Sequence, residues 1–211
     1  MKKGLVVLSA FLLVAAFVPR PAAAAVDFGL KGGLALSNLT WTGGGPAESY
    51  DNVQKPVFGA FVAFNLSPMF AVQPEVYYWT GGASAEETDG TDTYKMELLF
   101  NYIHVPVLAK FRFGTGQLKP ILFAGPAVSF LTTATEKMYF NGVLEDEMDV
   151  KPFLKGTDFS AVFGTGLEYA MNKITLILDV RYNLGLTNIN LKGEETSIKN
   201  KAWMFMLGIG F

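Results

Sequence analysis

Hydrophobic side chains alternate with small or polar ones along much of the chain, and this period of two predicts β-strands. In residues 27–36, phenylalanine or leucine fills most alternate positions, with glycine, alanine or a charged residue between them. The same pattern runs through residues 157–170, 175–186 and 203–211. Strand composition with less regular alternation is found in residues 57–66, 70–80, 98–113 and 118–131. The sequence therefore predicts eight strands.

Two features interrupt the less regular segments. Apolar residues become adjacent at Tyr102 and Ile103, and such a break in the period of two is typical of a β-bulge, which we expect at this point. Prolines, each of which removes a donor from the hydrogen-bond ladder, occur at positions 74, 106, 120 and 126.

The connections between these strands alternate in length. The long ones are residues 40–56, 81–95, 132–156 and 187–199, and the short ones are residues 67–69, 114–117 and 171–173. Outer-membrane barrels are built with short periplasmic turns and longer external loops. We therefore predict an all-β fold, an eight-stranded antiparallel up-and-down transmembrane β-barrel, with both termini on the periplasmic side.

Alternation does not by itself show which face of the barrel is apolar. The small volume inside an eight-stranded barrel decides this question. The interior of an eight-stranded barrel has room only for side chains. The positions rich in glycine also carry the charges, whereas the opposite positions are phenylalanine, leucine, tyrosine or tryptophan on nearly every strand. We therefore expect small and polar residues inside and apolar residues outside, as in a membrane. A soluble, lipocalin-like barrel with the reverse arrangement remains the alternative.

Aromatic residues gather near the ends of the predicted strands, where amphipathic rings favour the membrane interface. We expect two girdles: Phe64, Phe70, Phe111, Phe113, Tyr169 and Phe211 near the short turns, and Tyr78, Trp79, Phe100, Phe130, Phe159 and Trp203 near the long loops.

The N-terminus has the composition of a secretory signal peptide. A basic start precedes an apolar run of 15 residues, 4–18, and small residues follow. This run is shorter than the ~20 residues that a membrane-spanning helix requires. We predict a cleaved signal peptide over residues 1–25, with cleavage between Ala25 and Val26, and an outer-membrane β-barrel domain over residues 26–211.

Composition narrows the classes of function. The chain is 50% hydrophobic with a mean hydropathy of +0.28, and its net charge is −2 without a basic run in the barrel. Nucleic-acid partners are therefore not expected. The predicted long loops carry 13 of the 19 acidic residues. Two interpretations stay open for these carboxylates: they join the divalent-cation network of lipopolysaccharide, or they keep the loops soluble.

Charged residues also occur on the inward positions of the predicted strands: Glu75, Lys110, Arg112, Glu168, Asp179 and Arg181. Charges in a narrow lumen are tolerable only when they are paired. We therefore expect an interior charge network, a salt-bridged plug that closes the barrel. Two functional interpretations stay open, a binding site for a small polar ligand and a path for protons or ions.

Candidate catalytic residues are scarce. Catalysis by acid, base or nucleophile requires positioned groups, and the chain offers one histidine, His104, and no cysteine. A lipid acyl-hydrolase or acyltransferase would require this histidine beside a serine, Ser84 or Ser129, facing the lipid. Residues 89–92 have acidic spacing faintly like that of a calcium loop but lack the downstream glutamate. We predict no enzyme, no cofactor and no metal site.

The chain ends on an alternating apolar run, Trp203, Phe205, Leu207, Ile209 and Phe211. An exposed apolar strand at a terminus is a liability for a soluble protein. The run resembles the C-terminal signal by which bacterial outer-membrane barrels are recognised by their assembly machinery. We therefore expect the barrel assembly machinery to be a partner during insertion.

Longer stretches resemble the PorT-like family of outer-membrane β-barrels, which is common in Bacteroidetes-type bacteria. The resemblance rests on residues 102–108 (YIHVPVL), 119–126 (KPILFAGP), 157–159 (TDF), 164–169 (GTGLEY), 179–186 (DVRYNLGL) and 207–211 (LGIGF). It covers essentially the whole chain after the predicted signal peptide and implies an outer-membrane barrel. Most members of the family have no assigned function. One takes part in secreting proteases across the outer membrane, a role that the resemblance does not transfer.

Together these features predict a small, multi-pass β-barrel of the bacterial outer membrane, surrounded by lipids that include lipopolysaccharide. We expect a structural or interaction component with a closed lumen, accessory to protein export or to a surface complex. The longest predicted loop, residues 132–156, is the candidate for contact with a protein partner. The alternatives are a small-solute channel or ligand-binding barrel, and a lipid-modifying enzyme.

Overall fold

The computed structural model describes residues 26–43, 50–191 and 196–211, so the predicted signal peptide and its last residue, Ala25, lie outside the described residues. These described residues form nine strands and one short 3-10 helix: β1 (Val26–Thr42), β2 (Asp51–Asn65), β3 (Phe70–Asp89), β4 (Asp92–Arg112), β5 (Leu118–Phe140), β6 (Val143–Asp149), η1 (Lys151–Phe153), β7 (Thr157–Met171), β8 (Ile174–Gly185) and β9 (Ser197–Gly210). Within the described residues, no helix is long and apolar enough to cross a membrane.

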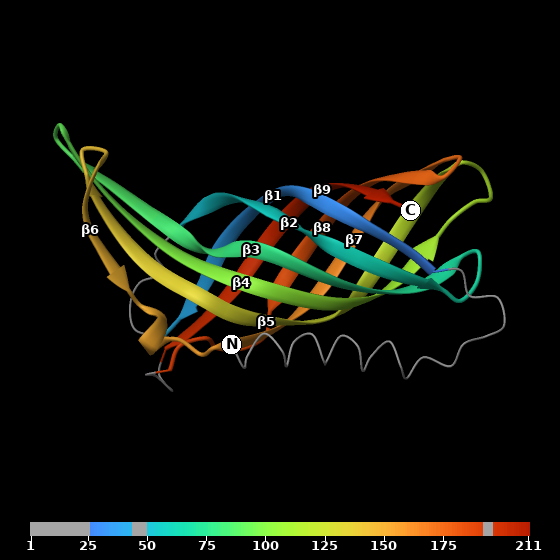
Figure 1. Cartoon of the computed structure of the whole chain (residues 1–211). Coiled ribbons are helices and arrows are strands. Elements are labelled where there is room, and N and C mark those ends of the chain that lie inside the picture. The colour runs from blue at the N-terminus through green and yellow to red at the C-terminus, as the bar shows by residue number, and fades with distance from the viewer. Residues whose placement is uncertain (1–25, 44–49, 192–195) are drawn as a thin grey trace.

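Eight of the strands close into an antiparallel ring (Figure 1). Strands β1 to β5 pair in chain order, and β5 then pairs with β7, β7 with β8, β8 with β9, and β9 with β1. The two ends of the ring are joined by the backbone: the Phe28 N–H donates to the Phe211 carbonyl oxygen, and the Phe211 N–H donates to that of Phe28. The predicted eight-stranded, all-β ring is confirmed.

Both termini of the ring lie at the end where the short turns connect β2 to β3, β4 to β5 and β7 to β8 (Figure 1). We call this the terminal end and the opposite one the hairpin end. In outer-membrane barrels the short turns face the periplasm, and the common position of both termini follows from the even number of strands in the ring.

Two of the predicted long loops are wrong, because most of residues 81–95 and 132–156 continue the strands instead. Strands β3 and β4 extend to a two-residue turn at Gly90 and Thr91, and β5 extends to Asn141 and Gly142 before β6 begins. Asn141 and Gly142 both have positive φ, 49° and 80°, as in the tight turn that suits a β-hairpin. Charged residues obscured the strands, since a sheet in water tolerates charge on both faces.

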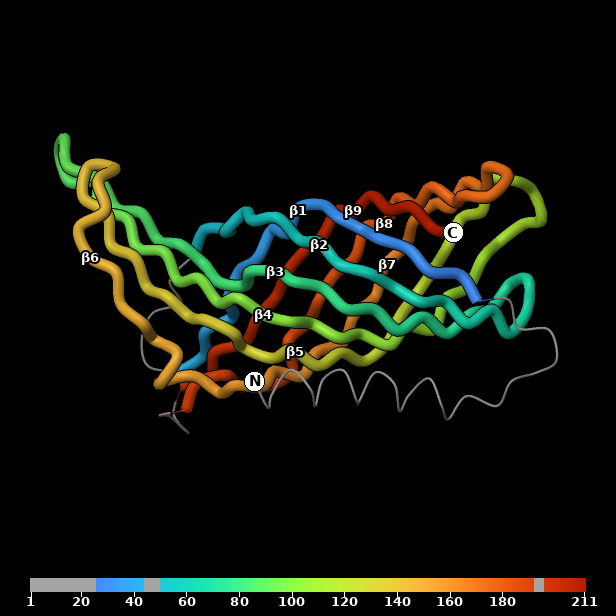
Figure 2. The backbone as a smooth tube through the Cα atoms, viewed as in Figure 1, coloured from blue at the N-terminus to red at the C-terminus, as the bar shows by residue number. Residues whose placement is uncertain are grey.

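These extended hairpins form one unit beyond the ring, which we call the external sheet: residues 83–89, 92–98, 134–140 and 143–149 (Figure 2). Its two tips are joined through Asn141, whose N–H donates to the Thr93 carbonyl oxygen at 2.8 Å. The Asn141 side chain accepts from the Thr93 N–H and donates to the Asp92 carboxylate. The hairpins therefore do not move as two separate loops.

The orientation of the barrel wall agrees with the sequence prediction. Outward-facing apolar side chains are exposed, up to 68% for Leu207, whereas inward-facing Lys31 and Glu75 are buried. Inward glycines make room for large side chains: a Cβ at Gly29 would lie 2.6 Å from the Phe61 ring, and one at Gly164 would lie 2.6 Å from the Phe123 ring. The glycine-rich positions thus leave space for aromatic rings inside the lumen.

The predicted bulge and part of the predicted girdle require correction. The register does shift between Asn101 and Tyr102, but the extra residue is Thr132 in β5. Strand β4 keeps its phase, so Phe100 and Tyr102 both point inward. Trp79 and Phe100, which we assigned to the girdle near the long loops, are buried in the lumen. The sequence misled here because the interior contains aromatic as well as small and polar residues.

Candidate functional site

A quartet of charges crosses the lumen near its middle. The Lys31 ammonium, from β1, lies 2.7 Å from Asp179 Oδ2 and 3.2 Å from Glu75 Oε1. The Arg181 guanidinium lies 2.6 Å from Glu75 Oε2. It also donates hydrogen bonds to both carboxylate oxygens of Asp179, at 2.7 and 3.0 Å. All four side chains are almost fully buried. Two cations thus balance two carboxylates, with the two-point geometry that makes arginine–carboxylate pairs strong.

A second charged group lies toward the terminal end. The Lys110 ammonium is 2.6 Å from Glu168 Oε1, and Arg112 Nε is 2.6 Å from Glu168 Oε2. Arg112 also donates from Nη1 to the Asn65 side-chain oxygen at 2.7 Å, while its Nη2 stays 3.8 Å from the half-exposed carboxylate of Asp27. Two buried cations therefore share one buried carboxylate.

A thin apolar layer separates the two charged groups. It consists of Phe61, Ala63 and Ile177, which pack together and are buried. The Phe61 ring has the Lys31 ammonium 5.2 Å and the Lys110 ammonium 5.8 Å from its centre. Cations over an aromatic face are attracted to it, so this ring joins the two groups electrostatically while closing the space between them.

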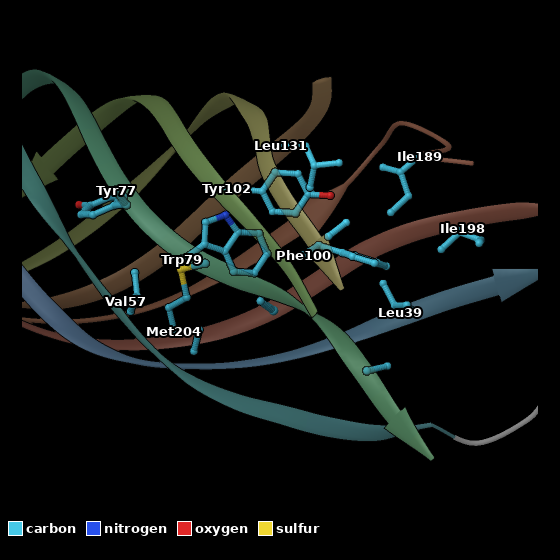
Figure 3. Packing of buried hydrophobic residues seen from close by; sticks show 14 of the residues in the cluster. Leu39, Val57, Tyr77, Trp79, Phe100, Tyr102, Leu131, Ile189, Ile198 and Met204 are labelled. Carbon is cyan, nitrogen blue, oxygen red and sulfur yellow. The ribbon is translucent and has the colours of Figure 1, made fainter. Parts of the chain in front are cut away.

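The half of the lumen toward the hairpin end is apolar, which the sequence did not predict. Figure 3 shows its buried cluster, with Trp79 beside Tyr102 and with Phe100, Leu131 and Ile198 farther along. Ile189, from the segment between β8 and β9, is fully buried in it, and its N–H donates to the Ile198 carbonyl oxygen at 2.9 Å. Packed hydrophobic side chains, rather than salt bridges, close this end.

Polar residues lie at the border of the apolar half. The Asn200 side chain donates to the Tyr102 hydroxyl at 3.1 Å and to Asp158 Oδ2 at 3.0 Å. These three residues lie on β9, β4 and β7, so the contact spans the lumen. Nearby, His104 Nδ1 and Ser129 Oγ are 2.8 Å apart and both buried. The pair faces the lumen, whereas an enzyme acting on lipid would require it to face outward.

The structure brings the six sequence-predicted network residues together in two groups rather than one. Glu75, Asp179 and Arg181 belong to the quartet, and the other three form the second group. The sequence reasoning missed Lys31, although its inward position between Leu30 and Gly32 in an alternating strand was a usable signal. It also missed the contact of Asn200 with Asp158, for which the sequence held no signal, because 42 residues separate them.

The C-terminal run occupies β9 and the residue after it. Trp203, Phe205, Leu207 and Phe211 have exposed side chains on the outer face. Val26, the residue that follows the predicted cleavage, is the first residue of β1. Within the described residues, no group of three or more histidine or acidic side chains is placed to hold a metal ion. The acidic spacing at residues 89–92 belongs to the hairpin turn between β3 and β4.

Comparison with known proteins gives one family and a set of similar structures. The family model for the outer membrane protein beta-barrel domain matches residues 19–190. The chain is similar in structure to Neisserial surface protein A, with 13% identity over 89% of this chain and 97% of that one and a TM-score of 0.51. It is also similar to outer membrane protein W of E. coli, with 17% identity, coverage of 89% and 98%, and a TM-score of 0.47. No curated protein matches the chain.

Proposed function

Because the chain belongs to the outer membrane protein beta-barrel domain family and lies in the outer membrane, we propose that it is a non-conducting barrel that presents its external sheet to a protein partner. The predicted fold and location are confirmed by that family. One observation carries the proposed function: a four-stranded sheet extends beyond a closed lumen and exposes a strip of apolar side chains on one of its faces.

The filled lumen supports the absence of conduction. From the terminal end inward, the second charged group, the Phe61 layer, the quartet and the apolar cluster follow one another. An eight-stranded barrel has little space beyond its own side chains. A small-solute channel, the main alternative, would require several of these layers to move together.

The face of the external sheet that continues the lumen wall carries an apolar strip, although strand pairing also places Glu87, Glu136 and Asp146 on this face. Strand pairing places Met96 opposite Met138, and Tyr94 opposite Phe140 with ring centres 5.1 Å apart. On β6, Met148 shares this face and is half exposed. An exposed apolar patch outside the membrane is typical of a protein–protein contact.

The opposite face of the external sheet is charged. Its lysines are paired, Lys95 with Glu97 at 2.8 Å and Lys137 with Glu147 at 3.3 Å. In total the external sheet carries ten carboxylates and two lysines: Glu86, Glu87, Asp89, Asp92, Glu97, Glu136, Glu145, Asp146, Glu147 and Asp149, against Lys95 and Lys137. Electrostatic complementarity therefore favours a partner with excess positive charge and disfavours contact with an anionic surface.

The proposal also includes the partners and the role that the sequence predicts. We also propose an accessory role in export or in a surface complex, with contact at residues 132–156, most of which form a hairpin rather than a loop. Lipopolysaccharide and other lipids surround the apolar wall, and the assembly machinery recognises the C-terminal run. We propose no catalysis, since the His104–Ser129 pair is buried in the lumen.

The test compares two positions on β6 in living cells. A photo-crosslinking residue replaces either Met148, on the apolar face, or Leu144, on the charged face, where exposure is similar. We expect one discrete protein adduct at Met148, none at Leu144, and loss of the adduct when Tyr94→Ser and Met138→Ser are combined. Leu144→Ser, whose exposed fraction of 44% equals that of Met138, is the control that leaves the adduct.

Two outcomes would overturn the proposal. Adducts of equal yield at both positions, or at neither, would mean that the apolar face is not a contact surface. A stable single-channel conductance of the purified protein in planar bilayers would show that the lumen conducts and would favour the small-solute channel.

A further inference from the structure

The terminal end of the lumen opens into a hollow of about 630 Å³, which we call the terminal hollow. Its charged lining includes Lys110 and Arg112 deep inside and Lys119 and Lys173 nearer the rim. Its apolar lining includes Phe61, Ile174 and Ile177. We propose that the terminal hollow binds a single anionic group, a phosphate or phosphate monoester, at the periplasmic side of the membrane.

The lining of the terminal hollow has an excess of positive charge. The side chains lining the terminal hollow comprise four cations, Lys110, Arg112, Lys119 and Lys173, and two carboxylates, Asp27 and Glu168. Glu168 uses one oxygen for Lys110 and the other for Arg112, so it is fully engaged. The quartet farther inside is balanced by its own two carboxylates, so it supplies no spare negative charge. The lining side chains therefore leave an excess of two positive charges, which favours binding of an anion.

Unused donors are the second argument. The Lys110 ammonium has three N–H groups, and the described residues give it one hydrogen-bond acceptor, Glu168. Arg112 donates from Nε and Nη1, but its Nη2 finds only Asp27 at 3.8 Å, beyond hydrogen-bond distance. Asp27 Oδ2 already accepts from Asn65 at 2.8 Å. Both residues are mostly buried, but Arg112 Nη2 is not among the fully buried atoms that lack a partner, so it reaches the open space of the terminal hollow, where a ligand can accept from it.

The position and shape of the terminal hollow restrict the ligand. The Phe61 layer closes its inner side, so a ligand enters and leaves from the terminal end and does not cross the membrane. A phosphate takes several donors at once, as arginine and lysine provide here. The apolar part of the lining accommodates a short alkyl or aryl group on the phosphate. A free phosphate monoester and the headgroup of a lipid in the inner leaflet share this chemistry.

The experiment measures binding of inorganic phosphate and of hexyl phosphate to the full-length mature protein in detergent, by calorimetry at low salt. The main variant, Lys119→Gln with Lys173→Gln, changes rim residues outside both charged groups, so folding is retained. We expect saturable binding, tighter for hexyl phosphate, and at least a tenfold loss of affinity in this variant. Lys155→Gln with Lys199→Gln, near the hairpin end, is the charge-matched control and should bind like the parent.

The experiment also distinguishes a free phosphate monoester from the headgroup of a lipid. Binding of hexyl phosphate in lipid-free detergent supports a free monoester. Phospholipid that co-purifies with the parent protein in native mass spectrometry, and is lost in the rim variant, supports the headgroup. Absence of both, or binding that the rim variant and the control weaken equally, would overturn the proposal. None of these readouts depends on the external sheet, so this site and the proposed function stand or fail separately.

Discussion

The two halves of the lumen are filled by opposite chemistry. Toward the terminal end, Arg181 and Lys31 are paired with carboxylates from β3 and β8. Toward the hairpin end, Trp79, Phe100 and Leu131 pack among other hydrophobic residues. Contact with lipid requires only that the outer face of the wall be apolar. Inside the lumen, by contrast, each charged or polar side chain requires a partner, and each apolar side chain requires close packing. A barrel can therefore be closed by charge pairs or by packing, and this one uses both.

The charged half and the apolar half of the lumen differ in how a substitution lowers the stability of the barrel. A buried charge left without its partner is strongly unfavourable, although a complete buried pair adds little net stability over a hydrophobic replacement. A packed apolar cluster loses stability in proportion to the cavity that a truncation leaves. Single substitutions in each half of the lumen separate these two behaviours.

The largest effect is expected for Arg181→Leu in the charged half. The change leaves Glu75 and Asp179 facing each other with Lys31 as their only cation. We expect a loss of about 4 kcal/mol in the free energy of unfolding, the cost typical of breaking a buried pair. Urea titration of the protein refolded into lipid vesicles measures it, with Leu178→Ala on the lipid-facing side of the same strand as the control. An unchanged unfolding midpoint would contradict the quartet's role in closing the barrel.

A somewhat smaller effect is expected for Trp79→Ala in the apolar half. Trp79 is fully buried, and its ring stacks on Tyr102 with centres 5.8 Å apart. The truncation leaves a large cavity and should cost about 3 kcal/mol, since neighbouring side chains fill part of it. Tyr78→Ala, one residue away on the outer face, is the matched control and should cost clearly less. Equal losses for both variants would mean that packing inside the lumen matters no more than contact with lipid.

The smallest effect is expected for Ser129→Ala at the border between the halves. Ser129 is hydrogen-bonded to His104, whereas the equally buried Ser160 has a hydroxyl without a partner among the described residues. Loss of one buried hydrogen bond should cost about 1 kcal/mol, and Ser160→Ala should cost little. The difference between the two unfolding free energies is the relevant measurement. If Ser160→Ala were the more harmful of the two, the assignment of partners at this border would be wrong.

The strands and their facing were predictable because a period of two is a local property. Residues 27–36 show it plainly, and β1 spans them with its large side chains outward. The hairpin of β5 and β6 was predictable in part, since Asn141-Gly142 is a strong turn signal, but the charges around it outweighed that signal. The inward aromatic residues Trp79 and Phe100 were not predictable, because an apolar side chain fits either face of such a wall.

The sequence by itself determined that this chain forms an eight-stranded barrel wall with charged residues on its inner side. Neighbouring residues of a strand point to opposite faces, so the local alternation of apolar and polar residues defines both faces. Only the tertiary structure decided which charges meet. Lys31 and Asp179 are 148 residues apart and come within 2.7 Å of each other because the ring closes between β1 and β9 in one register. Partner choice inside the lumen depends on that closure, and no local pattern contains it.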